Sequence, residues 1–174
     1  AIADQKRTTV KCAVLSQFPI TQQSEIDPGI DQRAILKVTI EIDNRPLVLF
    51  VNHWRSKQSP ESQRLRSARV LHQEINKLPA GTDFILAGDF NSNYNEHQTI
   101  LDEPRLNDTN GLTAINHVLG TIKNNKLVEE IQLRRQGATC LYNLWLELPP
   151  YRRWSYNFYG HRNSLDHLIV PAAL

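Results

Sequence analysis

A chain of 174 residues is long enough for one domain with a sizeable core, and its 40% apolar and 22% charged residues are typical of globular proteins. No apolar stretch approaches the roughly 20 residues of a membrane-spanning helix, so the sequence excludes a helical membrane span. The net charge of +2 is too small to indicate a nucleic-acid partner by itself. Cys12 and Cys140 leave open both an exported protein with a disulfide and a reduced one with free thiols. Localisation and oligomeric state stay undetermined.

The first part of the chain is expected to form strands. Residues 10–16 are rich in β-formers, whereas residues 21–32 are polar with a Pro-Gly pair and indicate a loop. Apolar and polar residues alternate over 33–43, which is typical of a half-exposed strand. Residues 47–53 are apolar on both faces and predict a buried strand. The short polar turn between the last two segments predicts a hairpin.

The clearest helix is predicted over residues 59–78. Ser59 suits the N-cap and Pro60 suits the first helical position. Apolar residues at spacings of three and four form one stripe along this segment. The stripe consists of Leu65, Ala68, Leu71, Ile75 and Leu78. A buried strand over 83–90 follows.

The second half has weaker signals. A short helix is predicted within 111–122, and residues 123–140 look irregular. Two strands, 153–160 and 164–170, are predicted with a polar turn at 161–163 between them. This order of elements predicts a single α/β layered domain with mixed strand directions.

The stretch "GDFNS" is the strongest local signal of a site. Gly88 allows a close turn at the end of a strand, and Asp89 and Asn91 are spaced to point to one side of an extended chain. A carboxylate and an amide in this arrangement can bind a hard cation or hold a water beside a phosphate. A turn that merely closes the strand is an equally good interpretation of these five residues.

Two further polar residues interrupt apolar strands. His53 ends the strand at 47–53 and could transfer a proton near neutral pH, although a lone histidine at a strand end is more often only hydrogen-bonded or solvated. Alternation puts Asn52 on the opposite face. Asp166 lies among apolar residues, so we expect it to need a partner, which could be a histidine, a metal or a backbone turn. His167 alternates to the other face.

Taken together and in order, four stretches resemble the endonuclease/exonuclease/phosphatase family, the DNase I-like metal-dependent phosphoesterases. They are "AVLSQFPI", "LVLFVNHWRSK" with Arg64 on the following helix, "FILAGDFNS" and "RWSYNFYGHRNSLDHLIV". The resemblance covers nearly the whole chain, with "GDFN" its most specific part. It implies a DNase I-like layered α/β sandwich over residues 1–174, incomplete at both ends.

The resemblance also implies roles for single residues. His53 is expected to contact the scissile phosphate or leaving group, and Asp89 to orient or deprotonate the attacking water. Asn91 is expected to hydrogen-bond phosphoryl oxygens, and Asp166 to orient a catalytic or phosphate-contacting group. Asp89 and Asn91 are the predicted ligands of Mg²⁺, with Mn²⁺ or Ca²⁺ as alternatives. The expected substrate contacts are Arg55, Lys57 and Arg64.

The expected function is metal-dependent hydrolysis of phosphodiesters, with DNA as the favoured substrate. The family's early asparagine and glutamate have no counterpart before Val10, and its final Ser-Asp-His stretch has none after Asp166. We therefore expect the chain to be part of a longer enzyme. A phosphatase, a lipid phosphodiesterase, a catalytically incomplete binding module and an unrelated α/β domain remain open.

Overall fold

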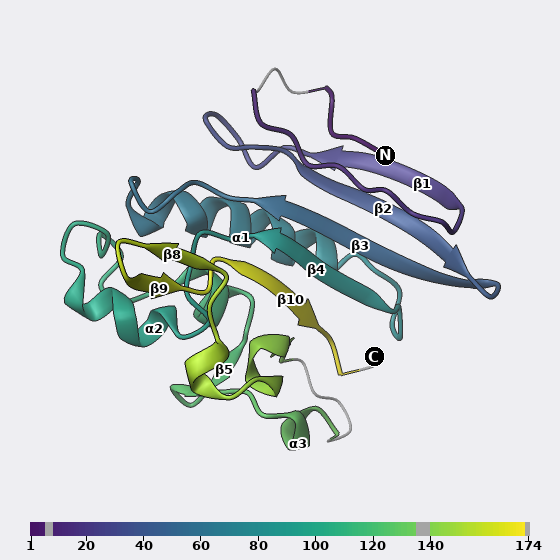
Figure 1. Ribbon diagram of the computed structural model, residues 1–174. Helices are drawn as coiled ribbons and strands as arrows, with labels where there is room; N and C mark the ends of the chain where they lie inside the picture. The colour runs from purple at the N-terminus through teal and green to yellow at the C-terminus, as the bar shows by residue number, and fades with distance from the viewer. Residues whose placement is uncertain (6–8, 135–139, 173–174) are drawn as a thin grey trace.

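The computed structural model describes residues 1–5, 9–134 and 140–172, and within these residues its centre is a mixed sheet of six strands. The strand order is β1-β2-β3-β4-β10-β7, and Figure 1 shows the sheet running across the molecule beside helix α1. The six strands are β1 (Ile20–Ile26), β2 (Ile35–Ile42), β3 (Arg45–His53), β4 (Phe84–Asp89), β7 (Tyr142–Asn143) and β10 (Asp166–Val170). The predicted α/β class with mixed strand directions is confirmed.

Strands β2 and β3 form the hairpin that the sequence predicts. They pair antiparallel, from Leu36 opposite Val51 to Ile42 opposite Arg45. The two turn residues, Asp43 and Asn44, have φ of 49° and 61°, the left-handed conformation that two-residue hairpin turns favour.

The direction of the next strands fixes where the polar strand ends meet. Strand β4 lies parallel to β3, with helix α1 (Glu61–Ile75) connecting them in sequence. Parallel neighbours end at the same edge of a sheet. Strand β10 is antiparallel to β4, so β10 begins where β3 and β4 end. His53, Asp89 and Asp166 therefore come to one edge.

Helix α1 covers one face of the sheet and forms the main core there. It starts at Glu61 with Pro60 in the N-cap position and no side-chain cap, so the prediction that Ser59 caps the helix is wrong. The predicted apolar stripe is confirmed, because its members are buried or pack against the core. The sheet residues in this core are Ile35, Val48, Phe50, Phe84, Leu86 and Ile169.

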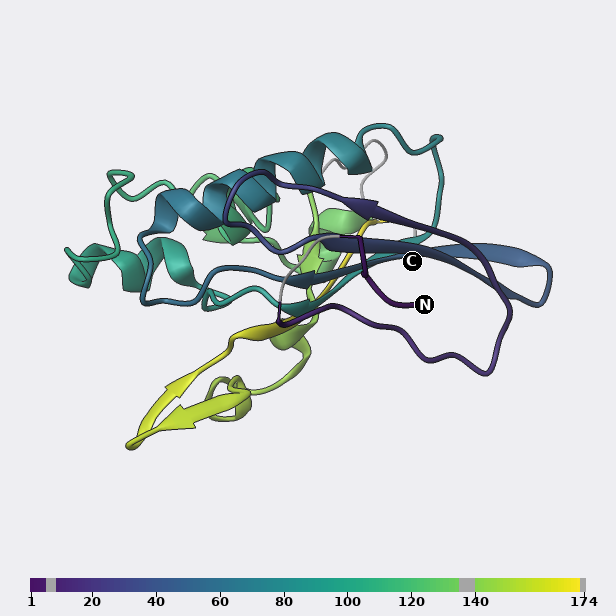
Figure 2. The same cartoon turned by 90° about the horizontal axis from the view of Figure 1, so that it is seen from above.

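The N-terminal segment packs on the opposite face of the sheet, as Figure 2 shows from above. Its Ala3, Cys12 and Val14 join a second apolar cluster with β2 residues such as Val38. The strand expected at residues 10–16 is not formed, since the described residues there make only an isolated bridge between Ile2 and Ala13. The extra strand is instead β1, in a segment expected to be a loop, because its polar side chains lie at a sheet edge where one face needs no burial.

The second half is mostly short elements. They are α2 (Glu96–Thr99), β5 (Ile122–Lys123), β6 (Lys126–Leu127), α3 (Glu130–Leu133), β8 (Tyr156–Phe158) and β9 (His161–Asn163), with 3₁₀ turns at Ile100–Asp102, Leu144–Glu147 and Pro150–Arg152. The predicted short helix within 111–122 is a π-helical turn, Ala114–Val118. Of the segment expected to be irregular, residues 135–139 lie outside the described residues.

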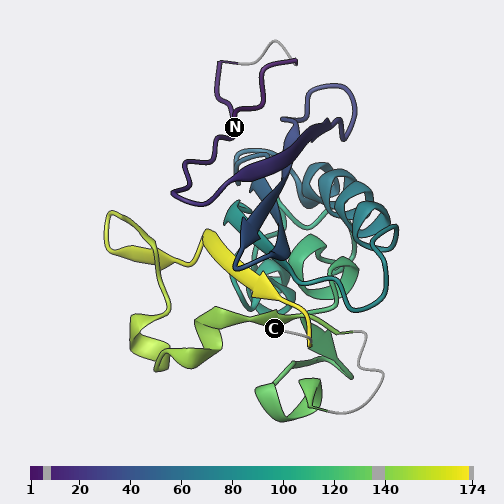
Figure 3. The same cartoon turned by 90° about the vertical axis from the view of Figure 1, so that its right-hand side faces the viewer.

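The predicted turn at 161–163 is wrong, because these residues form strand β9. Strand β9 pairs antiparallel with β8, and a two-residue turn at Tyr159 and Gly160 joins the two strands. Figure 3 shows this hairpin standing off the body of the protein, on the side away from α1.

The described residues also show the state of the two cysteines and the length of the helices. Both cysteines are free, with Cys12 buried and Cys140 partly exposed. Among the described residues, no helix combines the length and the apolar character that crossing a membrane requires.

Candidate active site

Three polar side chains singled out in the sequence lie side by side across three neighbouring strands. Pairing places His53 at the end of β3 opposite Asp89 at the end of β4. It also places Asp89 opposite Asp166 at the start of β10. Residues opposite one another on neighbouring strands project from the same face of the sheet. We call His53, Asp89 and Asp166 the site row.

The imidazole of His53 is in contact with the carboxyl of Asp89. Nε2 of His53 lies 3.5 Å from Oδ2 of Asp89, and the two side chains are 29% and 31% exposed. Burial lowers the pKa of His53, and the nearby Arg33 guanidinium lowers this pKa further, against the opposite effect of the carboxylates. Burial also raises the pKa of Asp89. Both shifts run against the charged forms, so burial opposes the attraction within this pair.

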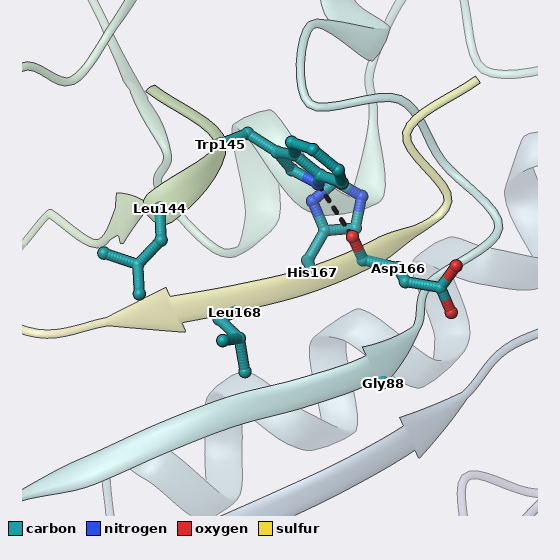
Figure 4. A pocket seen from close by; sticks show the side chains of 6 residues that line it. All are labelled: Gly88, Leu144, Trp145, Asp166, His167 and Leu168. Carbon is teal, nitrogen blue, oxygen red and sulfur yellow. Dashed lines mark hydrogen bonds between the residues drawn. The ribbon is translucent and has the colours of Figure 1, made fainter. Parts of the chain in front are cut away.

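Asp166 is more open to solvent than the sequence suggested. We expected it to be buried with a partner, but the residue is exposed. Figure 4 shows its carboxylate pointing away from Trp145 and His167. Its negative charge raises the pKa of both His53 and Asp89, which places it within electrostatic reach of the rest of the site row.

Asn91 is held in a turn and is not in the extended backbone that the sequence suggested. Its φ is 49°, and its backbone N–H donates to Oδ1 of Asp89 at 2.8 Å. The amide nitrogen of its side chain donates to the carbonyl oxygen of Trp54 at 3.1 Å. Asn91 thus fixes the Asp89 carboxyl, and it also lines a pocket together with the three residues of the site row. Its role toward metal or phosphate stays a prediction.

Gly88 lets β3 and β4 approach closely beside the site row. A Cβ atom at this position would lie 2.1 Å from the backbone oxygen of Asn52, which is far inside contact distance. The φ of Gly88 is also 118°, which side chains disfavour. The glycine in "GDFNS" is therefore required by packing as well as by conformation.

Two arginines hold the loop that follows His53. Nη1 of Arg33 donates to the carbonyl oxygen of Trp54 at 2.7 Å. Arg64 is fully buried, bonds Glu61 at 2.7 Å and donates to the carbonyl oxygens of Arg55, Ser56 and Ser59. This burial contradicts the prediction that Arg64 contacts substrate. Both arginines hold backbone carbonyls of this loop, and no sequence signal marks Arg33.

A pocket of about 650 Å³ opens over the site row. Its walls combine strand ends, the loop after His53 and the β8–β9 hairpin. The lining residues are His53, Ser56, Lys57, Gln58, Asp89, Asn91, Arg105, Tyr156, Phe158, His161, Asn163, Leu165 and Asp166.

The cations around this pocket differ from the predicted set. Lys57 lines it, and its Nζ lies 2.9 Å from the buried carboxylate of Glu96. Arg55 does not line it, so its expected substrate contact is not supported by its placement. Arg105, which the sequence analysis missed, does line it and donates to the carbonyl oxygen of Lys57 at 3.2 Å. Arg105 follows a polar loop with no motif, so no local signal marks it.

A second, more apolar pocket of about 410 Å³ adjoins the first at Asp166. Figure 4 shows Leu144 and Trp145 on one side of β10 and Leu168 on the strand. The indole Nε1 of Trp145 donates to the backbone oxygen of Asp166 at 2.7 Å. The Trp145 side chain thus supports the start of β10 from outside the sheet.

His167 is a buried support of the site and not one of its reactive groups. It lies on the opposite face from Asp166, as alternation predicted, and is 3% exposed. Its Nε2 lies 2.8 Å from the carbonyl oxygen of Ser92, which can only accept, so Nε2 carries the proton. Its Nδ1 then accepts from the Asn143 amide at 2.9 Å. Burial lowers the pKa of His167 to about 4, so the ring stays neutral and holds the loop after Asp89.

Comparison with known proteins gives one family and several solved structures of the same fold. The model of the Endonuclease/Exonuclease/phosphatase family matches residues 5–174. No curated protein sequence matches the chain.

Solved structures share the fold at low sequence identity. TDP2 from D. rerio, in complex with a single-strand DNA product, superposes with a TM-score of 0.55 at 16% identity, over 87% of this chain and 52% of its own. The human Nocturnin catalytic domain with a bound sulfate anion gives 0.56 at 16% identity, over 88% and 48%. A mannosyl-6-phosphatase from Bacteroides thetaiotaomicron gives 0.51 at 14% identity, over 88% and 53%. The chain therefore spans about half the length of these proteins, and the likeness confirms the DNase I-like fold class.

Proposed function

Because the chain belongs to the endonuclease/exonuclease/phosphatase family, we propose that it provides the catalytic site of a metal-dependent phosphodiester hydrolase acting on nucleic acid, with DNA as the favoured substrate. The observation that carries this proposal is the site row. His53, Asp89 and Asp166 face one pocket from three adjacent strands.

The chemistry of phosphodiester hydrolysis needs groups of these kinds. A water must be oriented and deprotonated, and the leaving oxygen must gain a proton. Asp89 suits the first task, because burial raises the pKa of its carboxyl and makes the carboxylate a stronger base. His53 suits contact with the phosphate or leaving oxygen, because its ring lies next to Asp89 and lines the same pocket.

The residues present also fit a divalent cation. Asp89 and Asp166 are like-charged groups opposite one another, and the Asp166 charge helps to raise the pKa of Asp89. A cation between such carboxylates would relieve this repulsion. Mg²⁺ often takes one or two carboxylates from the protein and completes its shell with water and phosphate. When bound, Mg²⁺ would supply charge stabilisation for the phosphoryl oxygens. We propose Asp89 and Asp166 as its ligands, with the Asn91 amide oxygen as a third.

The charge around the pocket supports a polyanionic substrate. Lys57 and Arg105 line the pocket, on two different segments of the chain. Such groups bind phosphate oxygens of any sequence. The TDP2 structure with single-strand DNA supports the same preference by fold likeness. These cations could also receive a phosphomonoester, so the substrate class has to be measured.

A substrate panel tests the proposal. Initial rates with magnesium are compared for single-stranded DNA, duplex DNA, RNA, bis-p-nitrophenyl phosphate, p-nitrophenyl phosphate and phosphatidylinositol. We expect hydrolysis of the diesters, fastest on DNA, and a loss of roughly 100-fold or more in His53→Ala. Activity confined to the monoester would replace the proposal with a phosphatase, and activity confined to the lipid would replace it with a lipid phosphodiesterase. Undiminished turnover in His53→Ala would remove the histidine from the site.

A further inference from the structure

The β8–β9 hairpin exposes three aromatic rings beside the pocket. Tyr156, Phe158 and Tyr159 are 45%, 55% and 89% exposed. Grouped aromatic side chains in water mark binding surfaces more often than isolated ones do. None of the roles derived for the site row explains them.

Strand alternation gives the hairpin two different faces. Tyr156 is paired with Asn163, and Phe158 is paired with His161. These four residues all line the pocket that contains the site row. On the other face, Arg162 lies over the ring of Trp154 at 4.9 Å. One face of the hairpin is therefore a wall of the pocket, and the other is braced by a cation–π contact.

The two rings on the pocket wall are nearly parallel to each other. Tyr156 and Phe158 have ring centroids 6.2 Å apart and ring planes only 11° from parallel. Phe158 is also in edge contact with Tyr159, at 4.5 Å. Parallel rings present parallel faces, which suits flat ligands that are themselves stacked, such as successive bases of a nucleic acid.

The tip of the hairpin carries Tyr159 in a backbone conformation that tyrosine disfavours. Tyr159 has a φ of 47°, and Gly160 has a φ of 87°, as a two-residue hairpin turn requires. Asn157 fixes the turn by accepting from the N–H of Gly160 at 3.0 Å. The first turn position favours Asn, Asp or Gly, so a tyrosine there is uncommon. The exposed ring is kept at a position where a smaller residue would be more stable.

We propose that the pocket-facing side of the β8–β9 hairpin, through Tyr156 and Phe158, is a stacking wall for unpaired bases of a single-stranded nucleic acid whose phosphate lies at the site row. This inference rests on the proposed function and adds the form of the substrate. Bases inside a duplex have both faces covered by stacked neighbours, whereas an unpaired strand can turn a base toward these rings. Two cations that line the same pocket, Lys57 and Arg105, are available to the backbone of the same strand. A combination of ring faces and cations is the general signature of single-strand binding.

The test separates the contribution of the bases to binding from that of the phosphates. Fluorescence anisotropy in EDTA measures the affinity of the chain for a labelled oligothymidylate and for an oligomer of equal length whose residues are abasic. The wild type should bind the base-containing strand at least about tenfold more tightly, given the usual strength of base–aromatic stacking. The double variant Tyr156→Thr/Phe158→Thr should lose this preference and bind the abasic strand as the wild type does. Threonine keeps the strand propensity, so the hairpin should survive.

Two further variants serve as controls. Tyr156→Trp/Phe158→Trp should retain the preference, because another aromatic ring can stack. Tyr151→Ala, at an exposed ring outside the pocket, should leave the preference unchanged. Equal affinity of the wild type for the two strands would overturn the proposal, as would a preference that survives in the threonine variant. Binding to phosphatidylserine vesicles without any base preference would assign the rings to a lipid surface and overturn it too.

The same strands distinguish this proposal from the proposed function. With magnesium, hydrolysis of the abasic strand at the rate of the base-containing strand, together with equal affinities, would overturn the stacking wall and leave the hydrolase standing. A base preference lost in the threonine variant, with no hydrolysis of either strand, would support the stacking wall and contradict the hydrolase.

Discussion

Nε2 of His53 lies 3.5 Å from Oδ2 of Asp89, yet the environment lowers the pKa of the histidine and raises that of the aspartate. Burial dominates both shifts, and the attraction within the pair does not overcome it. The relationship exists because β3 and β4 are parallel and in register at these two residues.

The first prediction concerns the influence of Arg33 on His53. The Arg33 guanidinium contributes to the low pKa of His53, so Arg33→Gln should raise this pKa toward the ordinary value of 6.5. His53 would then become protonated at a higher pH than in the wild type. If neutral His53 is the active form, the acid limb of the rate profile should move to higher pH as well. NMR titration of the His53 ring measures the pKa directly. Arg45→Gln removes the same charge at the far end of β3 and should leave the pKa of His53 unchanged. A lower pKa in Arg33→Gln would refute this account.

The second prediction concerns stability in acid. The unfolded chain protonates His167 near pH 6.5, whereas the folded protein does so only near about pH 4. Protons therefore favour the unfolded state as pH falls from 6.5 toward 4, and the stabilisation that is complete above 6.5 is lost across this window. The free energy of unfolding of the wild type should drop by roughly 3 kcal/mol more than that of His167→Gln between pH 7 and pH 4. Urea titrations at several pH values measure this. His72→Gln, at an exposed histidine on α1, should behave as the wild type. Parallel pH profiles for wild type and His167→Gln would show that the ring is protonated without cost.

The third prediction concerns the close approach at Gly88. Gly88→Ala would place a methyl group 2.1 Å from the Asn52 backbone oxygen and should lower the free energy of unfolding by about 2–4 kcal/mol. Gly81→Ala is the matched control, since Gly81 also has positive φ, 76°, but no atom within 4 Å of the added group. It should cost only about 1 kcal/mol, from conformation alone. Chemical denaturation of both variants measures the difference. Equal losses would mean that the contact with Asn52 relaxes freely.

The sequence marked the three residues of the site row, while their catalytic roles stay predictions. His53, Asp89 and Asp166 each interrupt an apolar strand, and period-two alternation placed Asn52 and His167 on the opposite face as found. Those signals are local and strong. Their meeting in one row depends on strand register, which no single stretch of sequence contains.

The errors have physical reasons. Residues 21–32 are polar, which predicted a loop, but an edge strand can also be polar, and part of this segment forms β1. Residues 10–16 were predicted to be a strand, but they pack as an irregular cover on the sheet. The substrate contact of Arg64 was implied by the family resemblance, whereas its burial depends on three backbone carbonyls brought near by the loop after His53. Arg33 and Arg105 carry no motif, and only tertiary structure brings them to the site.

The central claim is that the site row hydrolyses phosphodiesters with the help of a metal. The most direct measurement is the initial rate of cleavage of a fluorescent single-stranded oligonucleotide by the chain, in magnesium and in EDTA, for the wild type, Asp89→Asn and Asp166→Asn. Asp83→Asn removes the same charge at the other end of β4 and serves as the control. We predict cleavage by the wild type and Asp83→Asn in magnesium, with losses of roughly 100-fold or more in EDTA and in both site-row variants. Equal rates in Asp89→Asn and the wild type, or no magnesium-dependent cleavage by the wild type, would contradict the account.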